Sequence, residues 1–353
     1  MTSTSRRSAR GARAALLLAA LATASLAASV DVPAPGVAID GPLLGNFTGP
    51  LVSQQRFAAA DVGDLAPGDR IYAFSFRRDA SVGAFTGAHF PRFDVRLGAA
   101  ATTFVTDFAD NFAEAPTLVR AGPIDLTPEH LPSGDALPRP FGAAVLLDAP
   151  FVYAGGDLLL EIRSGQPSAP VAIDTLGTPD GQPNAATNGY STFHAGDVEA
   201  TSANAVVLRA NWPLRLHTLA AVDVAGAGSA VRTLHVKGLV HASLQGPARA
   251  EVAGDDLALF LGEGAPLVGE RVPALGIRGT LDLGDVGTQV LATAVRDDLR
   301  RVLPGATLVV SKVSASFRAN GNFSRLKVSV KATLSVNGRR GSYRITTNAR
   351  LKP

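Results

Sequence analysis

The sequence predicts a mainly β protein: an antiparallel β-sandwich or jelly roll at residues 45–218, followed by an antiparallel sheet with one covering α-helix at residues 219–353. Two observations predict this class. From about residue 50 onward, short segments alternate apolar with polar residues, and Gly, Pro, Asp and Asn separate them. One segment near residue 290 instead shows the apolar period of a helix.

The first half of the chain is expected to consist of short strands. Residues 93–97 alternate Phe, Val and Leu with charged residues, so one face of this strand would be buried and the other would meet water. In the segment 158–163 the same pattern places Glu161 and Arg163 on the solvent side. Further strands are predicted at residues 72–76, 141–147, 205–208 and 214–217. Because no segment between residues 50 and 218 has a convincing helical period, a sandwich or jelly roll is favoured.

The second half combines strands with one helix. Residues 220–230 are rich in Ala and Gly and are interpreted as a linker. Apolar residues at helical spacing predict a helix at residues 287–303, which Pro304-Gly305 would stop. Strand-like segments precede this helix, at residues 231–244, 248–252, 257–261 and 275–283.

The last fifty residues give the clearest strand pattern. Residues 326–336 alternate apolar with polar side chains without a break, and residues 343–352 repeat the alternation. Asn337-Gly338 between them supplies the positive φ angles of a tight hairpin turn. With a preceding strand at residues 309–317, this predicts three long antiparallel strands, each with an apolar face toward the helix and a polar, basic face toward solvent.

Residues 1–28 are predicted to be an export signal. Four arginines precede the apolar run 14–21, and small residues follow it, so cleavage is expected near Ser25 or Ala28. Ser5-Arg6-Arg7 leaves a twin-arginine route open as an alternative. Residues 29–44 are expected to form an extended lead-in. No later stretch is long and apolar enough to span a bilayer, so a secreted, periplasmic or cell-surface protein without a transmembrane segment is expected.

The amino-acid composition excludes several kinds of functional site and shows an uneven distribution of charge. There is no Cys, which excludes disulfides, thiolate metal sites and a Cys nucleophile. Charge is distributed unevenly, because residues 31–218 carry 20 Asp and Glu against 11 Arg, whereas residues 219–353 carry 18 Lys and Arg against 10 Asp and Glu. Residues 306–353 hold ten Lys and Arg and no acidic residue.

Several motifs in the first half occur in a recognisable order. They are QQRF at residues 54–57, RIYAFSFRRD at 70–79, FPRFDVRL at 90–97 and GDLLLEIR at 156–163. Over residues 50–180 the chain resembles a class of exported bacterial proteins that often carry a Pro-Glu-Pro sorting tail. The resemblance implies an extracellular β-sandwich and supplies no catalytic residue. This chain ends in Arg350-Leu351-Lys352-Pro353 rather than in such a tail, so surface sorting is not implied.

The basic strands favour a binding surface for polyanions. Side chains two apart on a strand point the same way, so most of the cations would share one surface and raise its positive potential. We call this surface the basic face and define it by Lys312, Arg325, Lys327, Lys331, Arg344, Arg350 and Lys352. Acidic envelope polysaccharide, anionic lipid head groups and extracellular nucleic acid are possible partners. Specific nucleic-acid recognition is not expected, because aromatic side chains for base stacking are nearly absent there.

Two plainer interpretations of the basic face stay open. Lys and Arg cover the wet face of many sheets and oppose aggregation through edge strands. The face could also dock on the acidic first half, which the charge balance allows.

Acidic loops in the first half are the candidates for a cation site. Asp107 and Asp110 cluster in one loop, and Asp174 and Asp180 lie in or beside a loop rich in Gly, Asn and Pro. Such oxygen ligands suit Ca²⁺, although no calcium-loop consensus is met and Asp is also an ordinary turn residue. His235 and His241 would share one face of a strand pair only if Gly238 does not shift the register.

The pattern as a whole favours a non-enzymatic envelope or extracellular protein with a structural or adhesive role. The sequence contains no nucleophile elbow, phosphate-binding glycine loop or HExxH pair. The main alternative is a carbohydrate-binding module, with or without Ca²⁺, that acts through first-half loops. A secreted hydrolase is the third possibility.

Overall fold

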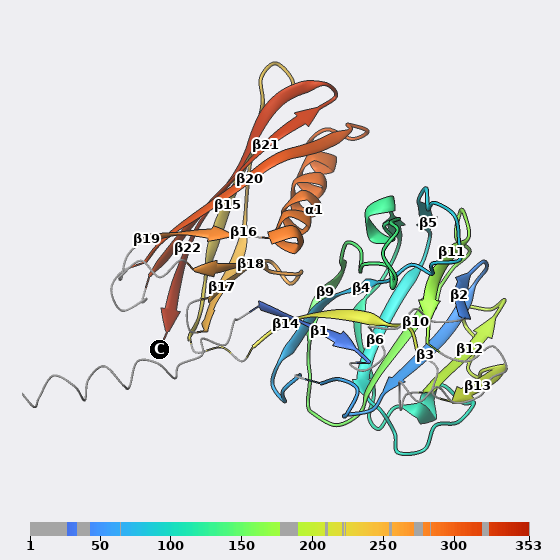
Figure 1. Cartoon of the computed structure of the whole chain (residues 1–353). Helices are drawn as coiled ribbons and strands as arrows, with labels where there is room; N and C mark the ends of the chain where they lie inside the picture. Colours follow the sequence, from blue (N-terminus) through green and yellow to red (C-terminus); the bar gives the residue numbers. More distant parts are fainter. Residues whose placement is uncertain are drawn as a thin grey trace, which may run out of the picture.

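The computed structural model shows a mainly β protein with antiparallel sheets and one α-helix (Figure 1). It describes residues 27–33, 43–63, 65–176, 190–208, 211–220, 222, 224–253, 256–271, 278–282, 284–319 and 325–352. The predicted fold class is confirmed. The first part is a sandwich-like arrangement of sheets, and the second is a sheet wrapped around the helix.

Two antiparallel sheets dominate the first half. The four-stranded sheet has the order β1 (Ala27–Val32), β14 (Leu214–Leu219), β4 (Arg70–Phe76) and β9 (Val145–Val152). The six-stranded sheet has the order β13 (Ala205–Leu208), β12 (Tyr190–Ala195), β3 (Leu51–Phe57), β10 (Leu158–Ser164), β6 (Phe93–Ala99) and β7 (Thr117–Arg120). The predicted strands correspond to these, except that β9 begins at Val145 and not at residue 141.

Shorter elements complete this half. β2 (Leu43–Phe47) pairs with β11 (Val171–Thr175), and β5 (Ala88–Phe90) pairs with β8 (Ile124–Leu126). Two single 3-10 turns, η1 (Ala109–Asn111) and η2 (Pro128–His130), lie in the connections. The predicted lead-in contributes β1, which pairs with β14 and buries Val30 and Val32 in the core. These residues therefore belong to the sheet.

The core of the first half is formed by side chains from both sheets. Phe74 and Leu216 of the four-stranded sheet belong to the same buried cluster as Val95 and Leu160 of the six-stranded sheet. The only Trp, Trp212, lies in this cluster with its ring 5.3 Å from that of Phe47, measured between centroids. Along β6, buried and half-buried side chains alternate from Phe93 to Leu97, which explains why the two-residue period predicted this strand. A jelly-roll connection order stays a prediction.

The second half is a closed antiparallel barrel (Figure 1). Its strands are β15 (Val224–Val236), β16 (Val240–Ala253), β17 (Asp256–Leu261), β18 (Leu267–Arg271), β19 (Arg278–Asp282), β20 (Leu308–Ala319), β21 (Leu326–Val336) and β22 (Arg339–Lys352). β15 pairs with β16 on one side and with β22 on the other, which closes the ring. The hairpin predicted at Asn337-Gly338 is confirmed, with φ of 48° and 78°.

Residues 220–230 were predicted to be a linker, which is wrong for residues 224–230, because they form the first half of β15. The glycines there serve close packing of the backbone. A Cβ atom on Gly226 would lie 1.8 Å from the carbonyl oxygen of Arg350, and one on Gly228 would lie 2.0 Å from that of Asn348. Glycine in a strand often marks such a close approach, so composition alone did not distinguish this strand from a linker.

The helix α1 (Gly284–Val302) confirms the one predicted at residues 287–303. Val290, Leu291, Val295 and Leu299 form its buried stripe within the barrel core. Gly305, with a φ of 81°, follows the helix and turns the chain toward β20. None of the helices in the described part of the chain is long and apolar enough to cross a membrane.

The two halves contact each other through the outer sides of two sheets. Tyr72 and Ala144 of the first half form one buried cluster with Ala258, Phe260 and Val268 of the barrel. Two polar contacts flank this cluster. Arg70 forms an ion pair with Glu251, and the backbone N–H of Ala144 donates to Oε1 of Gln289 at 3.1 Å. The interface therefore involves β4, β16, β17, β18 and α1.

Candidate functional site

The basic face lies on the outer side of β20, β21 and β22. Along β21, exposed Lys327 and Lys331 alternate with Leu326, Val328 and Val330, which point into the barrel core. Lys312, Arg325, Arg344 and Arg350 are also exposed. The backbone of Lys352 belongs to β22, and its side chain lies outside the described residues. The structure thus brings the described cations of the predicted set onto one surface.

Strand register places like charges directly opposite one another on this surface. Lys331 of β21 pairs with Arg344 of β22, and Lys327 of β21 pairs with Arg318 of β20. Like charges in directly opposite positions destabilise a sheet. Lys312, Lys327, Lys331, Arg344 and Arg350 form no ion pair within the part of the chain that the structure describes. The repulsion is therefore not offset by neighbouring carboxylates.

Most of the remaining outward positions of these strands are small and polar, but Val309 of β20 is apolar and 64% exposed. Ser314 lies opposite Lys331, and Asn348 lies opposite Lys327. Ser316, Ser329, Thr333 and Thr346 occupy the positions between them. Tyr343 and Phe317 are buried on the inner side, 1% and 7% exposed, so neither is available for stacking. Phe323 lies outside the described residues. The surface consists of cations separated mainly by hydroxyl and amide groups, with Val309 exposed near the start of β20.

The basic face does not dock on the first half. The contact between the halves involves the outer side of β17 and β18, where Phe260 and Val268 are buried. The described side chains of the basic face are exposed to solvent. Of the alternatives that the sequence left open, docking on the acidic half is thus wrong.

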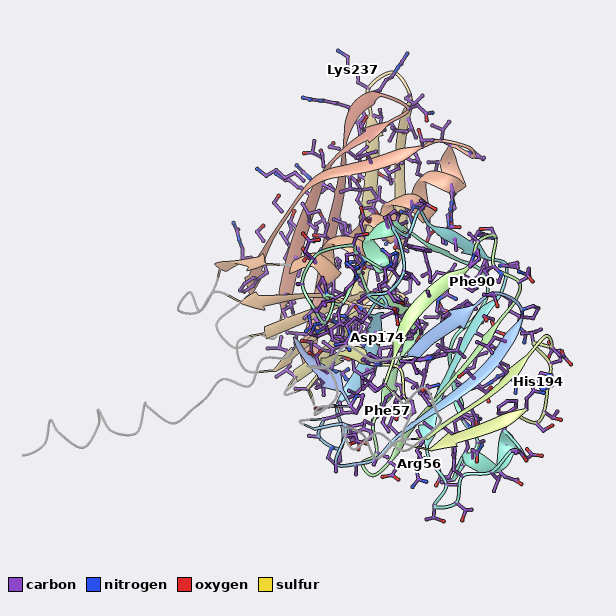
Figure 2. All side chains as sticks on the ribbon, turned by 45° about the vertical axis from the view of Figure 1, so that its right-hand side comes forward. Arg56, Phe57, Phe90, Asp174, His194 and Lys237 are labelled. Carbon is purple, nitrogen blue, oxygen red and sulfur yellow. The ribbon has the colours of Figure 1, made fainter. Side chains whose placement is uncertain are left out.

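The predicted cation ligands lie at separate places. Asp107 and Asp110 are exposed in the loop that contains η1, where Oδ1 of Asp107 accepts the backbone N–H of Ala109 at 2.9 Å. Asp174 is buried in β11 (Figure 2). It forms an ion pair with Arg77 at 2.5 Å. Asp180 lies outside the described residues. Among the residues described, no group of three or more His, Asp or Glu side chains could hold a metal ion. A calcium site stays a prediction.

The histidine pair has a defined register. His235 of β15 lies directly opposite His241 of β16, and their ring centroids are 5.2 Å apart. Gly238, in the turn between them, has a φ of 71° and does not shift their register. The two imidazoles share the outer surface and meet edge to face, with an angle of 82° between the ring planes.

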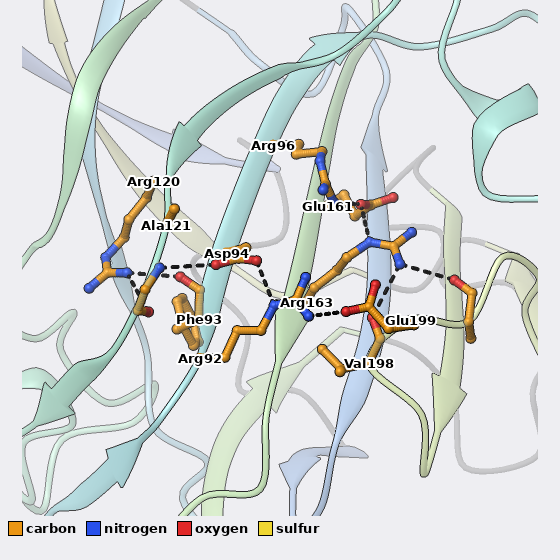
Figure 3. Close-up of polar contacts among 12 residues, drawn as sticks. Arg92, Phe93, Asp94, Arg96, Arg120, Ala121, Glu161, Arg163, Val198 and Glu199 are labelled. Atoms are coloured by element: carbon orange, nitrogen blue, oxygen red, sulfur yellow. Dashed lines mark hydrogen bonds and ion pairs between the residues drawn. The ribbon is translucent and has the colours of Figure 1, made fainter.

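A second charged surface, which the sequence did not predict, covers the outer side of the six-stranded sheet (Figure 3). Arg92 donates to Asp94 at 2.6 Å and also pairs with Glu199. The carboxylate of Glu199, and then that of Asp94, raises the pKa of Arg92. Arg120 donates to the carbonyl oxygen of Phe93 at 2.8 Å, and burial lowers its pKa. Positive and negative side chains lie opposite each other on the neighbouring strands β6 and β10.

The centre of this second surface is Glu161, which was predicted to face solvent and is 3% exposed. Its Oε1 accepts from Nη1 of Arg96 at 2.6 Å and from Nε of Arg163 at 2.7 Å. Its Oε2 accepts from Nε2 of Gln54 at 2.8 Å. The expectation was wrong because the loop with η1 and the segment 197–203 cover this face. A two-residue period predicts which side chains share a face of the sheet, but it does not predict whether a loop covers that face.

A cleft of about 490 Å³ opens beside these residues. Arg96, Glu161 and Arg163 form its charged floor, and Asp107 and Glu114 are exposed on its rim. Its apolar wall is lined by Phe108, Phe112, Ala113, Ala115 and Pro116. The Arg163 guanidinium lies 5.8 Å from the Phe108 ring centroid and donates to the carbonyl oxygens of Val198 and Ala200.

Comparisons with protein-family models, curated proteins and solved structures find no match for this chain. The resemblance to exported bacterial proteins stays a prediction.

Proposed function

We propose that this protein is an exported, non-enzymatic binding protein of the bacterial envelope, which holds anionic polysaccharide on the basic face of its barrel. The observation that carries the proposal is the set of exposed cations on β20, β21 and β22, placed opposite one another without carboxylates among them. A bound polyanion would remove the repulsion within each pair.

The composition of the surface supports polysaccharide over the other polyanions. Serine, threonine and asparagine between the cations supply hydrogen-bond donors and acceptors for sugar hydroxyl and carboxylate groups. A lipid surface would favour apolar or aromatic side chains next to the cations, and bases would need stacking platforms. Tyr343 and Phe317 are buried, and Val309 is the single large apolar side chain exposed on the described part of these three strands. The open, solvent-exposed surface also favours binding over a reaction, which needs groups fixed away from water.

The support for export comes from the sequence alone, since the structure does not describe residues 1–26. The basic residues, the apolar run and the small residues that follow it have the order of a secretory signal. The absence of Cys fits a fold that holds without disulfides.

Charge reversal tests the proposal. The protein should bind immobilised heparin, and alginate as a uronate polysaccharide, with an affinity that falls steeply with salt. Lys327→Glu together with Lys331→Glu should weaken binding at least tenfold at low ionic strength. The affinity and its salt dependence are measured by surface plasmon resonance between 20 and 300 mM NaCl, roughly the range in which such contacts are screened.

A matched control separates the basic face from total charge. Lys237→Glu with Arg301→Glu changes the net charge by the same amount. Lys237 lies in the turn at the far end of the barrel (Figure 2), and Arg301 lies in the last turn of α1. This variant should keep most of the affinity. Equal losses in both variants, or a wild type that heparin and alginate do not retain, would contradict the proposal.

A further inference from the structure

We infer that the cleft on the six-stranded sheet is a second binding site, which accepts a neutral, hydroxyl-rich saccharide. It lies in the first half of the chain, whereas the basic face lies on the barrel. Its volume, about 490 Å³, is in the range of small-molecule sites in proteins, roughly 300–1,000 Å³.

Glu161 on the floor of the cleft is connected to buried polar groups beneath it, which satisfy one another. Gln54 and Asn111 are both 0% exposed, and Nδ2 of Asn111 donates to Oε1 of Gln54 at 2.8 Å. Gln54 in turn donates to Glu161 and to the carbonyl oxygen of Phe108, each at 2.8 Å. Such a network holds the strands and the covering loop in one arrangement, which reduces the ordering cost of binding.

The exposed part of the cleft offers both donors and acceptors. Arg96 lines the cleft with its side chain 28% exposed, and within the described residues it donates to Glu161 through Nη1 alone. Asp107 and Glu114 present carboxylate oxygens on the rim, and Thr201 presents a hydroxyl. A ligand must therefore accept from a guanidinium and donate to carboxylates at neighbouring positions.

Vicinal hydroxyl groups have this property, because each hydroxyl both donates and accepts. The wall of Phe112, Ala113 and Pro116 would meet the C–H faces of a sugar ring. The cleft is lined by two guanidinium groups and three carboxylates, so the formal charges of its lining nearly cancel. A strongly anionic ligand would meet the carboxylates of the rim, so a neutral saccharide fits best.

The experiment uses the full chain and three neutral hexasaccharides: a β-1,4-glucan, an α-1,4-glucan and a β-1,4-xylan. Isothermal titration calorimetry should show binding of at least one of them, with little change between 20 and 300 mM NaCl because no charge pairing is gained. Asp107→Asn with Glu114→Gln should weaken that binding at least tenfold. Both residues are exposed and the replacements keep their shape, so the fold is expected to persist.

The control is Asp135→Asn with Glu129→Gln, two exposed residues of the same half that do not line the cleft. It should bind the hexasaccharide as the wild type does. The inference is overturned if none of the three hexasaccharides binds, or if the rim variant binds as tightly as the control. The basic-face variant should retain hexasaccharide binding, so this result and the heparin result can fail independently.

Discussion

Asp298 shows how one residue inside the barrel connects the helix to the sheet. It is 2% exposed on α1 and accepts from Nε and Nη2 of Arg232 at 2.8 and 3.1 Å. The hydroxyl of Tyr343 also donates to it, at 2.5 Å. Burial, and then the nearby Asp298 carboxylate, raises the pKa of Tyr343. The apolar period of α1 puts most of its polar residues on the side that faces away from the barrel core. Asp298 instead lies on the buried side, where Arg232 supplies its partner.

Replacing Asp298 should therefore destabilise the barrel strongly. Asp298→Ala removes the partner of Arg232, whose side chain is 13% exposed, at a cost of about 3–5 kcal/mol, whereas Tyr343→Phe removes one hydrogen bond, at about 1–2 kcal/mol. The neighbouring Asp297 is exposed, and Asp297→Ala should change stability by less than about 0.5 kcal/mol. Urea unfolding followed by far-UV circular dichroism measures all three. The fluorescence of Trp212 reports the first half in the same experiment. Similar losses for Asp297→Ala and Asp298→Ala would show that the buried pair contributes nothing specific.

At the scale of single elements, the β21–β22 hairpin depends on its turn. Val336 pairs with Arg339, so Asn337 and Gly338 form a two-residue turn in which both have positive φ. This turn sets the register that places Lys331 opposite Arg344. Both the turn and the strands were predictable from local sequence, because the required φ angles and the two-residue period are properties of neighbouring residues.

Gly338→Ala should destabilise the barrel by about 1–2 kcal/mol, since a Cβ atom is disfavoured at positive φ. A Cβ there would meet no atom within 4 Å, so the effect is one of backbone conformation alone. Gly264 is equally open and has no positive φ, so Gly264→Ala should be neutral or slightly stabilising. The difference between the two urea midpoints measures the effect, and equal midpoints would argue against a conformational role for Gly338.

At the scale of the whole molecule, a histidine with a lowered pKa lies beside the contact between the halves. His217 of β14 lies with its Nε2 3.0 Å from Oγ of Ser75, and its ring centroid is 6.2 Å from that of Tyr72. Burial, and then the charge of Arg215, lowers the pKa of His217 to about 4, while Asp31 opposes the shift. Tyr72 belongs to the cluster shared with the barrel.

This lowered pKa predicts acid sensitivity with a definite sign. The folded protein holds His217 neutral down to about pH 4, whereas the unfolded chain takes up the proton near its ordinary pKa of 6.5. His217 therefore costs no stability above about pH 6.5, and its cost grows as the pH falls toward 4, to about 3 kcal/mol.

His217→Asn should remove this dependence, so the variant should gain stability over the wild type at pH 4.5 relative to pH 7.5. Urea midpoints followed by Trp212 fluorescence at the two pH values measure the gain. His241→Gln, at an exposed position of the barrel, serves as the control and should follow the wild type. If the His217→Asn variant also follows the wild type, His217 is not the source of the acid sensitivity.

The sequence by itself determined most of the strands, the helix and the surface on which the described cations lie, because these depend on periods of two and 3.6 residues and on the turn at Asn337-Gly338. Only the tertiary structure decided that β15 closes the barrel against β22, that Glu161 is covered and that Arg77 holds Asp174. The reason is physical: a local period reports which side chains share a face, whereas closure and burial depend on contacts between segments far apart in the chain. The cleft arises in the same way, since its floor and its rim come from different segments.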